Sequence, residues 1–318
     1  MPESDSQTMQ CMEVWGGNQP VDSAVVMAGL DAWVFSKPFG NADGGGDVYY
    51  VSSCATGRIT RILVADVAGH GASVRELAAD LRGLMRRHVN QLNQTRFVRL
   101  LNAQFTALSK NGIFATAVVT TFFATNNHLS LCNAGHPPPL LYTASTGQWA
   151  FLERARPEDP STGGLPLGIE DVFDYTEFEV RLRRGDMVLC YTDSLIEARF
   201  PDGELLGNQG LLKLIQTRDV ANPQTLIPAL LAAIIAKTGD SGLAADDITA
   251  LLFRAKADRS RVSFFKRAAA PLRLMGKIIG NLRPGGEPIP WPDLSLANLG
   301  GTFLTSLGNH WTGRAAKR

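Results

Sequence analysis

The sequence predicts an α+β fold built from antiparallel β-sheets. Short runs rich in β-branched and aromatic residues follow one another in blocks, separated by Asn, Gly and Pro clusters. Helical patterns occur in pairs between these blocks and do not alternate with single strands, which argues against a βαβ repeat. The chain has 318 residues, of which 45% are hydrophobic, so it can bury a large core.

The expected elements follow in order after a lead-in of residues 1–28. The first strand patterns cover residues 30–35, 47–53 and 58–66. Apolar residues at intervals of three and four then predict amphipathic helices over 74–89 and 97–108. Further strand patterns cover residues 114–124, 128–134, 138–143, 148–152, 175–182 and 185–193. The chain then predicts helices near 211–217 and 223–239 and a last strand over 246–254.

The composition changes after Arg254, and we expect the domain of residues 29–255 to end there. Residues 256–283 contain eight Lys or Arg and the single acidic residue Asp258, with aromatic and aliphatic residues between them. Residues beyond Pro284 are rich in Gly, Pro and Asn, which is typical of a loosely ordered extension. The basic part of this 256–318 extension suits contact with an anionic membrane, an acidic partner or the domain itself, and we favour packing on the domain or disorder over membrane contact.

Bulk properties exclude several classes of function. A formal net charge of +1 creates no global field for nucleic acid. The cysteines, Cys11, Cys54, Cys132 and Cys190, form no CxxC pair, so neither a zinc site nor a disulfide framework is indicated, and a reducing cytoplasm fits best. We find no signal peptide, and the longest apolar run, residues 226–236, is shorter than the roughly 20 residues of a membrane span.

Four separated segments place an aspartate at the end of a strand pattern, beside small residues. They are GGGDVYY with Asp47, VADVAGHG with Asp66, LCYTDS with Asp193, and AADDIT with Asp246 and Asp247. A single aspartate in such a place is more often a turn former or a helix cap. Four such segments together indicate an oxygen-only site for two hard cations, Mg²⁺ or Mn²⁺, which would activate a water molecule for phosphoester hydrolysis.

Six motifs occur in a specific order: GGD at 45–47, DVAGHG at 66–71, NAGHPPPLL at 133–141, GLPLGI at 164–169, GDMVLCYTDSLIEA at 185–198 and DDIT at 246–249. In this order the chain resembles the PPM (PP2C-like) serine/threonine phosphatases, specifically their SpoIIE/RsbU-type bacterial branch. The resemblance implies a β-sandwich of two antiparallel sheets flanked by pairs of helices. It also implies a two-metal centre at one edge and hydrolysis without a phosphoenzyme.

The resemblance also implies roles for individual residues. Asp47 and Asp66 would bind the first ion with the backbone carbonyl of Val67, and Asp66 would bridge to the second ion. Asp193 and Asp246 would complete the second site. The substrates implied are phosphoserine or phosphothreonine proteins, among them anti-sigma-factor antagonists of partner-switching pathways. The sequence leaves the oligomeric state open, with a homodimer as one option.

Other residues of these motifs have alternative roles. His70 is a candidate proton donor to the leaving alkoxide, with loop packing as the alternative. The residues expected to support the site through its loops are Gly46, Gly69, Gly71, Asn133, His136 and Asp247.

Two positions depart from the pattern of the branch. Tyr50 stands where Asp is common, and Ser194 stands where Gly is usual. Ser194 would cost about 1 kcal/mol if the backbone there required a positive φ. This departure motivates a rival interpretation, in which the chain is a non-catalytic pseudophosphatase that binds phosphoproteins.

Overall fold

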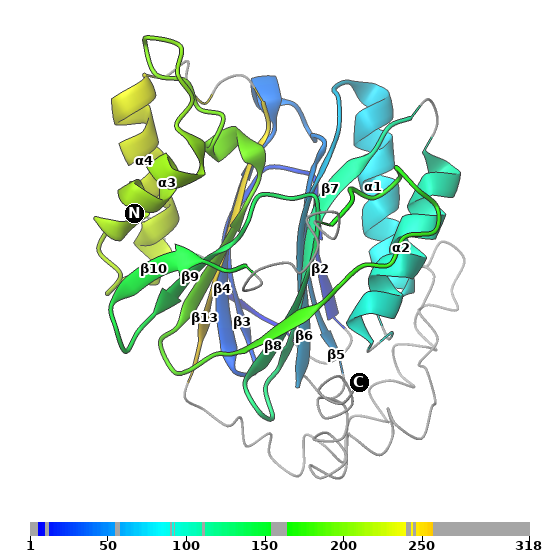
Figure 1. The fold of residues 1–318 in the computed structure, drawn as a ribbon, viewed down its shortest axis with the longest axis horizontal. Helices are drawn as coiled ribbons and strands as arrows, with labels where there is room; N and C mark the ends of the chain where they lie inside the picture. The colour runs from blue at the N-terminus through cyan, green and yellow to red at the C-terminus, as the bar shows by residue number, and fades with distance from the viewer. Residues whose placement is uncertain are drawn as a thin grey trace.

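The computed structural model describes residues 6–9, 13–54, 58–89, 91, 93–109, 112–153, 164–239, 243 and 246–256. Two β-sheets face each other, and a pair of helices covers the outer face of each sheet (Figure 1). The expected α+β sandwich of antiparallel sheets with flanking helical pairs is confirmed.

The two sheets differ in size. The larger sheet has the strand order β1 (Ser6–Thr8), β3 (Val21–Met27), β4 (Leu30–Lys37), β13 (Ile248–Ala255), β12 (Met187–Tyr191), β9 (Leu140–Thr143) and β10 (Gln148–Phe151). The smaller sheet has the order β11 (Phe178–Arg181), β8 (His128–Ala134), β7 (Ala115–Phe123), β6 (Ile59–Val67), β5 (Asp47–Cys54) and β2 (Glu13–Gly17). Neighbouring strands are antiparallel except β1 and β3, which are parallel.

Each helix pair packs on one sheet. Helices α1 (Ala72–Arg87) and α2 (Gln94–Leu108) cover the smaller sheet, and α3 (Gly207–Gln216) and α4 (Leu226–Thr238) cover the larger one. Three 3₁₀ turns complete the described elements: η1 (Phe39–Asn41), η3 (Asp193–Leu195) and η4 (Pro223–Thr225). The 3₁₀ turn η3 directly follows β12, so the chain bends sharply at Asp193.

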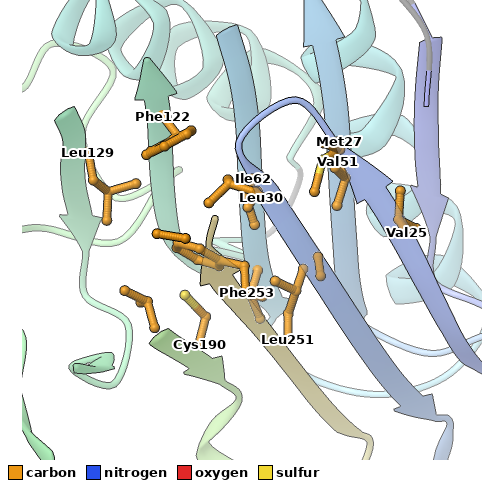
Figure 2. Close-up of a cluster of buried hydrophobic side chains, with 14 of the residues drawn as sticks. Val25, Met27, Leu30, Val51, Ile62, Phe122, Leu129, Cys190, Leu251 and Phe253 are labelled. Carbon is orange, nitrogen blue, oxygen red and sulfur yellow. The ribbon is translucent and has the colours of Figure 1, made fainter. Parts of the chain in front are cut away.

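The alternation of side chains along β5 determines where Asp47 points. Tyr49 and Val51 belong to the core between the two sheets, part of which is drawn in Figure 2. Val48 and Tyr50 belong to the core under α1 and α2. Because successive side chains of a strand point to opposite faces, Asp47 lies on the same face as Tyr49, toward the interior of the sandwich. Tyr50, the departure noted above, is buried beneath the helices.

The expected lead-in contributes strands to both sheets. Residues 13–17 form β2, which pairs with β5, and residues 21–27 form β3, which pairs with β4. Gly16 lies in β2 where this strand approaches β5 closely, because a Cβ there would lie 2.4 Å from the carbonyl oxygen of Tyr49. The sandwich therefore begins before residue 28.

The extension expected after residue 256 lies outside the described residues from 257 onward, so its boundary and its contacts stay predictions. In the described part of the chain, none of the helices combines the length and the hydrophobicity needed to cross a bilayer.

Candidate active site

Four acidic segments meet at one end of the sandwich. Asp47 begins β5 and Asp66 lies near the end of β6, and the antiparallel register places these two residues directly opposite each other. In the facing sheet, Asp193 follows β12 and Asp246 precedes β13. Because β12 and β13 are antiparallel neighbours, the residue after β12 and the residue before β13 lie at the same end of their sheet. Each sheet therefore contributes a pair of aspartates to this end.

Thr192 connects the two pairs. Its hydroxyl donates a hydrogen bond to Asp47 Oδ2 over 2.9 Å, and its Oγ1 accepts one from the backbone N–H of Thr249 over 3.0 Å. The hydroxyls of Thr249 and Ser36 are also hydrogen-bonded, 2.9 Å apart. Asp47, with 3% of its surface exposed, is thus held between the two sheets.

Asp247 holds the glycine loop that leads into β5. Its carboxylate accepts hydrogen bonds from the backbone N–H groups of Phe39, over 2.6 Å, and Gly46, over 2.5 Å. A Cβ on Gly45 would lie 2.1 Å from the Asp247 carboxylate, and a Cβ on Gly46 would lie 2.8 Å from the carbonyl oxygen of Val67. Glycine at both positions lets the loop approach this acidic end of the sandwich closely. Asp247 therefore braces the loop before Asp47, and its role in supporting a metal site stays a prediction.

The four carboxylates repel one another. Burial, followed by the charges of Asp193 and Asp246, raises the pKa of Asp66 from 3.8 to about 7. Burial and the charge of Asp66 raise the pKa of Asp47 well above its usual range. The pKa values of Asp193 and Asp246 are raised as well, chiefly by burial. A bound cation would offset this repulsion and favour the ionised carboxylates.

Within the ranges that the structure describes, no group of three His, Cys, Asp or Glu side chains is arranged to hold a metal ion. Asp47 is engaged by Thr192, and Asp247 by backbone amides. The structure thus brings the predicted acidic residues to one place, and their ligation of metal stays a prediction.

His70 lies at the rim of the acidic end. It is exposed, and its proximity to Asp246 lowers the pKa of that carboxyl, against the larger effect of burial. Gly69 and Gly71 on either side have φ values of 108° and 101°, which side chains other than glycine rarely adopt. These glycines turn the chain from β6 into α1, and this turn leaves the imidazole of His70 in solvent beside Asp246.

His136 is buried behind the site. Its Nδ1 is hydrogen-bonded to the Thr116 hydroxyl over 2.9 Å, and Thr116 lies opposite Asp66 in the β6–β7 register. Asn133 braces the same turn, because its Oδ1 accepts from the His136 backbone N–H and its Nδ2 donates to the His136 carbonyl. Burial lowers the pKa of His136 to about 3, so the ring is neutral. Asn133 and His136 therefore brace the turn.

Sequence reasoning missed two contributors to the site. Glu197 is exposed, and its charge raises the pKa of both Asp66 and Asp193. Its backbone N–H donates to the Asp193 carbonyl over 2.8 Å, which puts Glu197 one helical turn after that aspartate. The four-residue spacing within TDSLIE was the available signal. Thr192 had no comparable signal, because its partner Asp47 is 145 positions away.

The expected strain at Ser194 is absent. Among the described residues, Asn127 is the only non-glycine residue with a positive φ, so Ser194 fits its turn without that cost. Its hydroxyl lies 3.4 Å from Thr192 Oγ1.

The chain is similar to proteins of known class. The family model described as Stage II sporulation protein E (SpoIIE) matches residues 56–256. Phosphoserine phosphatase RsbU of Bacillus subtilis is 26% identical over 204 residues, which cover 61% of this chain and 55% of RsbU. The chain thus spans about half the length of that relative.

Solved structures share the fold. The RsbU and RsbW domains of Rv1364c from Mycobacterium tuberculosis match with a TM-score of 0.63 and 25% identity, over 83% of this chain and 72% of that one. The PP2C phosphatase domain of SpoIIE from Bacillus subtilis, solved with a fragment of its regulatory domain, matches with a TM-score of 0.59 and 16% identity, over 77% of this chain and 64% of that one.

Proposed function

Because the chain belongs to the SpoIIE family of PP2C-like phosphatases, we propose that it is a divalent-metal-dependent phosphatase of phosphoserine and phosphothreonine in proteins. The observation that carries this proposal is the meeting of Asp47, Asp66, Asp193 and Asp246 from both sheets, with carboxyl pKa values raised by burial and mutual repulsion. RsbU, a relative, is named a phosphoserine phosphatase. We extend that substrate class to this chain, with an anti-sigma-factor antagonist in partner switching as the candidate substrate.

The donor set fits two Mn²⁺ or Mg²⁺ ions. It consists of oxygen atoms, which hard cations prefer. Asp47, Asp66 and the Val67 carbonyl would hold one ion, and Asp66, Asp193 and Asp246 the other. Bound ions would acidify a water molecule and neutralise charge on the phosphoryl group.

The chain's own residues supply positioning and proton transfer. Thr192 holds Asp47 and thereby fixes the two sheets relative to each other. Asp247 holds the loop before Asp47. His70, which is exposed beside Asp246, would donate a proton to the leaving alkoxide of the substrate.

The rival function is a non-catalytic phosphoprotein-binding module, which Ser194 in place of the usual glycine suggests. The two functions differ in metal uptake, because a pseudophosphatase should bind Mn²⁺ weakly or not at all in calorimetry.

The test is hydrolysis of p-nitrophenyl phosphate and of a phosphoserine peptide with Mn²⁺, with Mg²⁺ and with chelator in parallel. We expect turnover with metal, none with chelator, and a loss of at least about a hundredfold in Asp193→Asn, since even groups that only support a ligand contribute up to that much. Asp80→Asn, an exposed change on α1, should match the wild type. Wild-type turnover by Asp193→Asn would refute the assignment.

A further inference from the structure

Residues 168–174, called the 168–174 strip below, lie along α2 with a fixed backbone. The buried side chain of Asn102 accepts a hydrogen bond from the Gly168 N–H over 3.0 Å and donates to the carbonyl oxygens of Glu170, over 2.6 Å, and Asp171, over 3.2 Å. Asp174 pairs with Arg99 over 3.0 Å, one turn earlier in the helix. In Figure 1 the chain that leads into β11 passes across the α1 and α2 layer. The strip therefore runs antiparallel to α2.

The strip exposes large apolar side chains although its backbone is held. Ile169 is 48% exposed and Val172 is 82% exposed, and Leu108 at the adjoining end of α2 is 43% exposed. Three of the six exposed large hydrophobic residues among the described ones are thus gathered here. Single exposed hydrophobic residues are common, but a cluster on a rigid segment is typical of a contact surface.

Acidic side chains lie between the apolar ones. Glu170 and Asp171 are exposed. Unlike Asp174, neither has a cation of the described residues within ion-pair distance. A partner that covers Ile169 and Val172 would therefore gain most if it also presented Lys or Arg.

The strip is continuous with the candidate active site. Leu167, directly before it, exchanges two backbone hydrogen bonds of 2.8 Å with Ala115. Ala115 lies opposite Val67, the neighbour of Asp66. Since an extended residue spans at most about 3.6 Å, Val172 lies within roughly 18 Å of Leu167. An extended peptide covers roughly 18 Å with about five residues, which puts Val172 within reach of a substrate bound at the acidic end.

We propose that the 168–174 strip is a docking surface for the phosphoprotein substrate, and that it selects an apolar side chain next to Lys or Arg about five or six residues from the phosphorylated residue. This inference rests on the proposed function. It adds the features of the substrate that the strip would recognise.

The test compares the rates at which the full chain hydrolyses two phosphoserine peptides in the presence of Mn²⁺. One peptide carries Leu and Arg at the fifth and sixth positions on both sides of the phosphoserine, and the other carries Gly and Glu there. We expect kcat/KM to be about tenfold higher for the Leu/Arg peptide. The double variant Ile169→Ser with Val172→Ser should remove this preference through KM, and Glu170→Lys with Asp171→Lys should reverse it. Hydrolysis of p-nitrophenyl phosphate should not change in either variant.

Matched controls lie elsewhere on the surface. Ile235→Ser on α4, and Glu76→Lys with Asp80→Lys on α1, repeat the same kinds of change at exposed positions and should keep the preference. Equal rates for both peptides in the wild type, or strip variants that keep the preference, would overturn the proposal. So would an equal loss on p-nitrophenyl phosphate, because the strip would then act on catalysis or folding.

Binding separates this inference from the proposed function. Fluorescence anisotropy of the labelled peptides does not require turnover, so strip-dependent binding without hydrolysis would support the strip and refute only the phosphatase activity. A second copy of the chain would be the occupant if strip variants changed the molar mass in light scattering. The chain's own basic segment would be the occupant if Lys266→Glu with Arg267→Glu raised the affinity for both peptides. Either result would overturn the proposal.

Discussion

Among the described residues, two polar clusters differ in how their charges are balanced: the cluster around Arg61 is buried, and the cluster of carboxylates at the end of the sandwich is partly exposed. Beneath α2, the guanidinium of Arg61 donates to Thr121 Oγ1 over 3.1 Å and to the Gln91 carbonyl over 2.6 Å, and it stacks 3.9 Å from the centroid of the Phe97 ring. Thr121 donates to Gln94 Oε1, and Gln94 donates to the Val119 carbonyl. The buried charge in this cluster is surrounded by complementary groups from the chain itself.

At the end of the sandwich, the carboxylates of Asp47, Asp66, Asp193 and Asp246 lie close enough together for their negative charges to interact. Burial and like charge raise their pKa values, and Glu197 adds to the repulsion. A cluster that serves only the fold needs its partners within the chain, as Arg61 has. The carboxylates accept hydrogen bonds, but their negative charges raise one another's pKa values, and such a cluster is suited to a ligand of opposite charge.

The largest effect should come from Asp66→Asn. We expect hydrolysis of p-nitrophenyl phosphate to fall by at least about a hundredfold, because a central carboxylate is lost. The metal-free variant should melt at the same temperature as the wild type or higher, since one repelling charge is removed. Activity assays measure the loss of hydrolysis, and thermal melts with chelator measure the melting temperature of the metal-free variant. A marked fall in the metal-free melting temperature would show that Asp66 serves the fold.

Arg61→Met should have the opposite profile. It leaves Thr121 and the Gln91 carbonyl without their donor, and we expect a loss of about 3 kcal/mol in the free energy of unfolding. Metal-dependent activity per folded molecule should stay near the wild-type value. Urea unfolding and activity at low temperature measure the two quantities. A large loss of activity in fully folded Arg61→Met would remove the contrast between the clusters.

Thr192→Val tests the group that links fold and site. The change keeps the shape of the side chain but removes the hydrogen bonds to Asp47 and from the Thr249 N–H. We expect a loss of about 1–2 kcal/mol of stability and a roughly ten- to hundredfold loss of activity. Thr192→Ser keeps the hydroxyl and should retain most of both. Equal stability and activity of the two variants would mean that the Thr192 hydroxyl contributes to neither.

The smallest expected effect is a pH dependence of metal binding. The Asp66 pKa of about 7 in the metal-free fold exceeds its ordinary value of 3.8, so the folded chain keeps this proton as the pH rises from about 4 to 7. Mn²⁺ must displace that proton, and its affinity should fall about fivefold from pH 7 to pH 6. Calorimetry at both values measures the change. A constant affinity from pH 6 to pH 8 would indicate an ordinary carboxyl.

The sequence alone predicts the strands and helices whose patterns depend only on neighbouring residues. The strands at 47–54 and 59–67 and helices α1 and α2 follow from periodicity that neighbouring residues carry. Strand β2 was missed because Gly16 and Gly17 are typical of a loop, and the close approach of Gly16 to β5, which explains glycine at that position, is visible only in the fold. Thr192 was missed because its role depends on two sheets meeting, which no local pattern encodes.

The most direct test of the central claim is a crystal structure of the chain grown with Mn²⁺, with an anomalous difference map. We expect two peaks at the acidic end of the sandwich, the first contacted by Asp47 and Asp66 and the second by Asp66, Asp193 and Asp246. An absence of peaks there at saturating Mn²⁺, with the four carboxylates turned away from one another, would contradict the account.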